Sequence, residues 1–152
     1  MTNNEVLKNL QNIFNLETSK ITEIYNILDD KMTEDHVNAW FKRLGDPSFL
    51  NLEDMELSTF LNALICEKRG KKEGPQPEPE KEITNNIILK KLKIALDLKN
   101  EDIMDILNLV NTSMNNYELT SFFRKPNHKN YRPVRDQLLR SFLKGLSLRE
   151  KS

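Results

Sequence analysis

The chain contains one sequence pattern twice, at a constant offset that aligns Thr2 with Thr84. Residues 2–70 and 84–152 align at this offset without a gap and are identical at 17 of 69 positions. Most of these positions are apolar, and both copies open with Thr-Asn-Asn, at Thr2 and at Thr84. A gapless match of this length indicates duplication of one folding unit. The chain therefore has to fold as two copies of one small structure.

Charge divides the chain in the same places as the repeat does. The first repeat, residues 1–70, has 7 Lys and Arg against 12 Asp and Glu and is acidic. The second repeat, residues 84–152, has 13 against 7 and is basic. Between them, residues 71–83 are rich in Pro and Glu, which favours an extended linker. Opposite charges allow the halves to attract each other, or allow the basic half to face an acidic partner.

Apolar residues recur at helical spacing through both copies, and N-cap residues stand before each apolar run. We predict an all-α fold of two tandem four-helix repeats packed as one bilobed unit. The first two helices of each copy are expected to start at Thr2 or Asn3 and near Thr18 or Asn100. The third should be capped by Thr33 and Asn115 and the fourth should begin near Asn51 or Pro133.

The fourth helices have apolar residues on more than one face, among them Ile65, Cys66 and Leu148. A helix wetted on one side does not need them, so we expect an interface between the copies at these helices. The second and third helices invite comparison with a helix-turn-helix, but the apolar and glycine positions of that motif are poorly matched.

Motifs for catalysis or metal binding are absent from the sequence. There is no glycine-rich phosphate loop and no paired cysteine, and neither His36 nor His128 has a carboxylate or histidine at ligand spacing. We therefore expect no enzyme activity, no cofactor, no metal and no small-molecule substrate. No apolar run approaches the roughly 20 residues of a membrane helix, and no secretory leader is visible. A single cysteine, Cys66, suits a reducing cytoplasm.

One segment of the second copy has gained positive charge. The run RKPNHKNYRPVR surrounds an aromatic residue with cations in a loop and a helix start. Cations for phosphates beside an aromatic able to stack on a base are typical of single-stranded RNA recognition. A second basic run flanks the linker. The candidate nucleic-acid-binding residues are Arg124, Lys125, His128, Lys129, Tyr131, Arg132, Arg135, Lys68 and Arg69.

Other interpretations of these features stay open. The basic loop could dock on the acidic first copy within the molecule. The chain could instead be a protein-interaction module with no nucleic-acid role, or a homodimer that matches an acidic copy to a basic one. The preferred hypothesis is a non-enzymatic accessory protein that binds RNA rather than DNA.

Several short stretches are similar to a known family. They are Asn85-Asn86-Ile87, Leu89-Lys90-Lys91-Leu92 with Ala95-Leu96, Phe60-Leu61-Asn62 with Leu64, Glu67-Lys68-Arg69-Gly70-Lys71, and His128-Lys129-Asn130. Together they resemble the YehS-like family of uncharacterised bacterial proteins, a duplicated domain of unknown function, and the likeness spans the chain. The resemblance implies a helical fold in a bacterial cytoplasm and supplies no activity, cofactor or catalytic residue.

Overall fold

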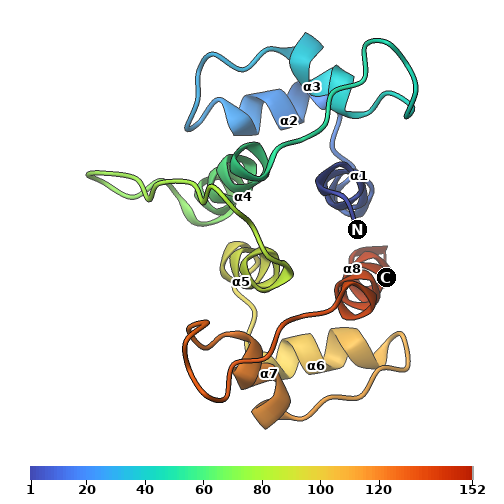
Figure 1. Cartoon of the computed structure of the whole chain (residues 1–152), viewed down its shortest axis with the longest axis vertical. Helices are drawn as coiled ribbons and strands as arrows, with labels where there is room; N and C mark the ends of the chain where they lie inside the picture. Colours follow the sequence, from blue (N-terminus) through green and yellow to red (C-terminus); the bar gives the residue numbers. More distant parts are fainter. Residues whose placement is uncertain (152) are drawn as a thin grey trace. The chain divides into compact units, whose positions relative to one another are not determined.

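The chain is all-helical in its computed structural model, which describes residues 1–151 (Figure 1). Over that range it has eight α-helices and no strand, which confirms the predicted fold class. The first compact unit covers Met1–Ile83 and the second begins at Thr84. The first unit holds α1 (Asn3–Phe14), α2 (Thr18–Tyr25), α3 (Glu34–Trp40) and α4 (Asp54–Arg69). The second holds α5 (Asn85–Ala95), α6 (Asn100–Asn108), α7 (Asn116–Phe122) and α8 (Asp136–Lys151).

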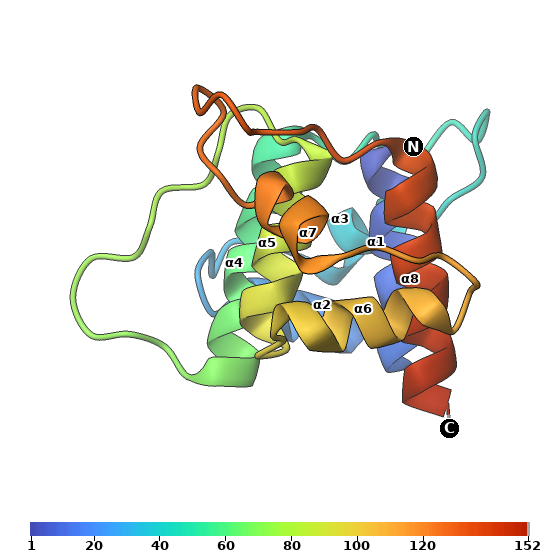
Figure 2. The same ribbon diagram turned by 90° about the horizontal axis from the view of Figure 1, so that it is seen from below.

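Both units use the same helix packing. In the first, α2 packs against α3 and α4, and α1 packs against α4; in the second, α6 packs against α7 and α8, and α5 packs against α8. Figure 1 looks along the first and last helices of each unit, with the second helix lying across the view. Figure 2 shows α6 running across the direction of α5 and α8. The duplication seen in the sequence is therefore a duplication of topology, whereas the expected interface between the copies stays a prediction.

Apolar positions shared by the copies form the cores. Leu57 and its counterpart Leu139 are fully buried, as are Leu10 and Leu92. Helix starts follow the local capping signals: Thr33 accepts a hydrogen bond from the His36 N–H, and Asn115 forms a capping box with Glu118. These ends were predicted correctly because the capping groups lie close to each other along the chain.

The fourth helices begin three residues later than expected, at Asp54 and Asp136. The cause is a pair of asparagines at the start of the first helix of each unit. In the first unit, Leu52 N donates to Asn4 Oδ1 (2.9 Å), and Asn3 Nδ2 donates to Leu52 O (3.0 Å) and Asp54 Oδ1 (2.7 Å). Because these bonds hold the backbone before Asp54 in an extended form, the helix cannot start at Asn51.

The linker, residues 71–83, contains no helix, and its end lies against α4. Glu80 N donates to Ser58 Oγ (2.9 Å), a fully buried hydroxyl, and the same hydroxyl donates to the Glu80 carboxylate. Ile83 N donates to Asp54 Oδ2 (3.0 Å). The last residues of the linker are thereby part of the first unit.

The helices α6 and α8 of the second unit cross very closely at Gly145. A Cβ atom added there would overlap the carbonyl oxygen of Ile106 and lie 2.9 Å from Ile106 Cγ2. The corresponding residue of the first unit is Ala63, which is fully buried. The absence of a side chain at Gly145 is thus what allows this crossing distance.

A candidate nucleic-acid interface

The basic segment 124–135 connects α7 to α8 and is fixed at both ends by one buried side chain. Asn86 Nδ2, on α5, donates to Phe122 O (3.1 Å) and Arg132 O (2.7 Å). Asn86 Oδ1 accepts from Val134 N (2.8 Å), and the residue is only 6% exposed. One amide therefore ties the beginning and the end of the loop to the first helix of the unit.

Turns inside the loop hold its middle part. His128 N donates to Lys125 O (2.9 Å), Tyr131 N donates to His128 O (3.0 Å), and Arg132 N donates to Ser121 O (3.2 Å). These bonds fold the segment into two successive tight turns. The loop is consequently a defined surface, held by its own backbone.

The first unit contains the same loop with different side chains. Each backbone bond just described has an equivalent at the matching positions of the first copy: Asp46 N to Arg43 O, Phe49 N to Asp46 O, and Leu50 N to Ala39 O. Asn4 takes the place of Asn86, donating to Trp40 O (2.9 Å) and Leu50 O (3.0 Å). Two loops of one backbone thus differ in the chemistry that they present.

The basic loop presents cations and the first-unit loop presents leucines. Residues 124–135 contain five Lys and Arg and no acid, whereas residues 42–53 contain two Lys and Arg and two acids. In the first-unit loop Leu44 is 88% exposed and Leu50 is 42% exposed. In the basic loop Arg124 and Tyr131 are half-buried, and the exposed candidates are Lys125, His128, Lys129, Arg132 and Arg135.

The remaining two candidates, Lys68 and Arg69, are in the last turn of α4 and so belong to the first unit. Lys68 Nζ lies 4.8 Å from the centre of the Phe14 ring, close enough for a cation–π interaction with α1. The structure therefore brings together seven of the nine candidate residues on one loop. The role of all nine stays a prediction.

A lysine supports the base of the basic loop. Lys93 Nζ lies 4.2 Å from the centre of the Phe123 ring and donates to Asn100 Oδ1 (2.9 Å). Burial lowers the pKa of Lys93 from its usual value. This lysine, which the first copy replaces with Gln11, is therefore held between Phe123 and Asn100 at the base of the loop.

His36 has a carboxylate partner that its sequence neighbours did not indicate. His36 Nε2 lies 3.1 Å from Glu56 Oε2, and its ring meets Trp40 edge-on with 5.2 Å between centroids. Trp40 itself is 2% exposed and belongs to the core. The pair joins α3 to α4, and because the two partners lie on different helices, no local spacing indicates their contact.

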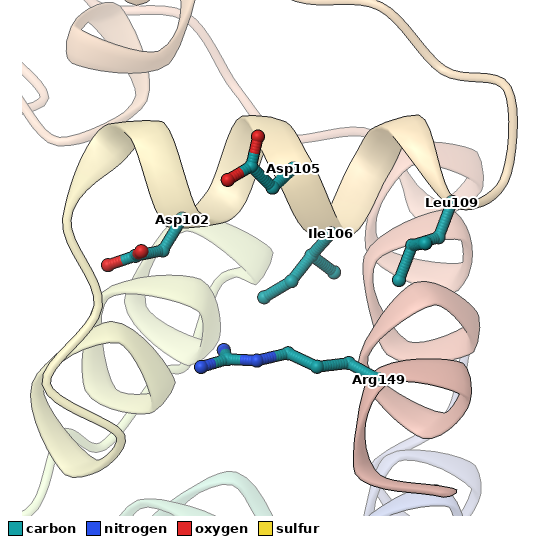
Figure 3. A pocket seen from close by; sticks show the side chains of 5 residues that line it. All are labelled: Asp102, Asp105, Ile106, Leu109 and Arg149. Carbon is teal, nitrogen blue, oxygen red and sulfur yellow. The ribbon is translucent and has the colours of Figure 1, made fainter. Parts of the chain in front are cut away.

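A pocket of about 290 Å³ lies between α6 and α8, lined by Asp102, Asp105, Ile106, Leu109 and Arg149. Figure 3 shows Arg149 reaching from α8 beneath Ile106, toward the side on which Asp102 lies. The first unit has charges of opposite sign at the equivalent places. There, Lys20 Nζ on α2 lies 3.2 Å from Glu67 Oε1 on α4. The charges around the pocket thus stand where the other copy has an ion pair between helices.

Residues 1–151 contain neither a cluster of metal-ligating side chains nor a helix able to span a membrane. No group of three or more His, Cys, Asp and Glu side chains in this range is arranged to hold a metal ion. Over the same residues, no helix combines the length and the apolar character required to cross a bilayer.

Comparison with known proteins returns sequence relatives without an assigned activity. The family described as "Protein of unknown function (DUF1456)" matches residues 3–70 and again residues 85–151. The chain is 39% identical over 151 residues to an "Uncharacterized protein YehS" of Escherichia coli, an alignment covering 99% of this chain and 97% of that protein. No solved structure matches the chain. One match lies within each of the two helical units.

Proposed function

The chain belongs to the DUF1456 family of unknown function, and from the chemistry of its basic loop we propose that it is a non-enzymatic accessory protein that binds nucleic acid. RNA is the preferred ligand over DNA. The proposal includes no cofactor, and it sets the protein in the cytoplasm, in keeping with its single cysteine, Cys66.

The observation that carries the proposal is the contrast between two loops that share their backbone hydrogen bonds. Folding requires the Asn86 clamp and the backbone turns, which the first unit forms equally well around Asn4. Five cations without an acid in the same segment are therefore not needed to build the loop. Such a concentration of positive charge attracts phosphates and releases their counterions.

The preference for RNA follows from the shape of the site. The five cations of residues 124–135 lie on a loop around Tyr131, and none of these five is in a helix. A duplex major groove is read by a helix or a two-stranded ribbon, whereas unpaired bases stack on aromatic rings between cations. In addition, the connection between α2 and α3 covers residues 26–33, longer than the three or four residues of a helix-turn-helix turn.

Binding of a short single-stranded RNA as a function of salt tests the proposal. Changing Lys129, Arg132 and Arg135 together to Glu should weaken binding strongly. It should also make the negative slope of log K against log salt less steep by about 2, because about 0.7 is lost for each of three phosphate contacts. The matched control reverses three exposed lysines of the same unit outside the loop, Lys90, Lys144 and Lys151.

If the loop variant and the control lose the same affinity, binding depends on net charge and the loop has no special role. If the unaltered protein shows no salt-dependent binding to RNA or DNA, the proposed function is wrong.

A second candidate function, a protein-interaction module, is favoured by the first-unit loop. Leu44 is 88% exposed on a loop whose backbone is fixed, and a contact with another protein would remove this apolar side chain from water. A partner captured from cell extract that survives nuclease treatment and is lost on Leu44→Asp would support this function. Homodimerisation through opposite charges is a variant, and it predicts a mass by light scattering that falls as salt rises.

A further inference from the structure

The imidazole of His128 has a defined proton position. His128 Nδ1 lies 3.0 Å from the backbone nitrogen of Asn130, which donates to it. A ring nitrogen that accepts a hydrogen bond carries no proton, so in the neutral ring the proton is on Nε2. His128 Nε2 is consequently a donor.

His128 Nε2 lies beside another donor. Arg124 Nη1 lies 3.4 Å from His128 Nε2, and a guanidinium nitrogen has hydrogens to give and no lone pair to accept one. The two groups cannot satisfy each other. An oxygen with several lone pairs could accept a hydrogen bond from both of them.

In the first unit, a carboxylate of the chain itself stands at the position equivalent to His128. Asp46, the counterpart of His128, accepts from Ser48 N through Oδ1 (2.8 Å), as His128 Nδ1 accepts from Asn130 N. Hydrogen bonds from Ser48, and the positive charge of Lys42, lower the pKa of the Asp46 carboxyl. Lys42 is the counterpart of Arg124.

The duplicated turn therefore exists in two electrostatic forms. In the first unit a cation stands beside a carboxylate, and in the second a cation stands beside an imidazole ring, which has no negative charge to offer. The turn is kept, since Asp and His both supply the acceptor that closes it. What the second unit lacks is the negative charge.

We infer that Arg124 Nη1 and His128 Nε2 together bind one phosphate oxyanion, supplied by the RNA strand. This inference rests on the proposed function, because it assigns one phosphate of the strand to one position in the basic loop. Arginine suits such a position, since its planar fork of donors matches the oxygens of a phosphate. The same chemistry would accept free inorganic phosphate, so the experiment includes both sources.

The test combines nitrogen NMR of histidine with one designed substitution. The chain has only two histidines, so His36, on the first unit, serves as the internal reference. The His128 spectrum should show the proton on Nε2 in the free protein. Inorganic phosphate should shift the His128 signals, while chloride at equal ionic strength should not.

The substitution His128→Asp copies the first unit into the second. It preserves the acceptor for Asn130 N, and hence the turn, while placing a carboxylate beside Arg124. We expect unchanged thermal stability and single-stranded RNA binding weakened about tenfold at low salt, as for one lost charge-assisted contact. Arg124→Gln removes the other donor and keeps His128, so it should weaken RNA binding to a similar degree and abolish the phosphate shift of the His128 signals.

A proton found on Nδ1, no phosphate shift at His128, or RNA binding unaffected by His128→Asp would each overturn the inference. These results are separable from failure of the proposed function. If RNA binds and depends on Lys129, Arg132 and Arg135 but not on His128, only the phosphate position is wrong. If phosphate shifts His128 but no RNA binds, the subsite is supported and the proposed function fails.

Discussion

Replacing Asn86 with Ala should destabilise the second unit and release the basic loop. The amide makes three hydrogen bonds to backbone groups, with Phe122 O, Arg132 O and Val134 N, and lies almost fully buried. A buried hydrogen bond contributes about 1 kcal/mol net, and a buried group left without a partner costs about 1–3 kcal/mol. We expect a loss of about 3–5 kcal/mol, since a few of the freed groups regain water. That is a large part of the roughly 5–15 kcal/mol by which small proteins are stable.

Urea unfolding and amide hydrogen exchange measure this effect. The Val134 N–H should exchange much faster in the variant, because its acceptor is gone. The matched control is Asn4→Ala, which removes the same three bonds from the first unit at a more exposed position. The control should cost less and should leave RNA binding intact. A loss below about 1 kcal/mol for Asn86→Ala, with Val134 still protected, would show that the clamp does not hold the loop.

Three further results are expected. Gly145→Ala should cost about 1–3 kcal/mol in chemical unfolding despite its better helix propensity, because the added carbon overlaps Ile106; an unchanged midpoint contradicts the close crossing. Burial raises the pKa of Tyr25 to about 12, whereas the phenol of the unfolded chain has a pKa of about 10. The buried neutral phenol therefore contributes its full stability below a pH of about 10, and this contribution is lost as the pH rises through about 12. Tyr25→Phe should remove this step from a plot of unfolding free energy against pH. Ser58→Ala should increase amide exchange at Glu80, since the linker loses its buried anchor; unchanged protection there would show that the anchor is unimportant.

Much of the fold could be predicted because its signals are local. Apolar spacing identified the helices, and the caps at Thr33 and Asn115 lie close in sequence to the groups that they satisfy. The constant offset between the copies extended each signal from one copy to the other. Fold class and repeat structure therefore followed from the sequence.

What the sequence could not show depends on contacts between distant residues. Asn3 was considered as a cap residue and Asn4 was given no role, yet their amides bind backbone groups far away in the chain, which is why the fourth-helix start was placed three residues early. His36 and Glu56 meet across two helices. In each case the two partners lie far apart in the sequence, and nothing near either residue indicates which polar group it will contact.

The composition of the sequence identified the candidate loop, but not the hydrogen bonds that fix its backbone. Clustered cations beside Tyr131 could be counted in the sequence. That Asn86 fixes this segment, and that His128 shares its turn geometry with Asp46, required coordinates. The contact between Arg124 Nη1 and His128 Nε2 likewise depends on how this segment turns.

Asn4 and Asn86 form these hydrogen bonds with main-chain atoms alone. The outward side chains between those atoms are therefore free to change without breaking the bonds. Duplication of an ancestral gene would therefore have produced, in one step, two loops held by the same hydrogen bonds. One could drift toward leucine and the other toward arginine while both kept folding. The same property makes residues 43–48 and 125–130, apart from the turn acceptors Asp46 and His128, natural places to install new recognition sequences in the laboratory.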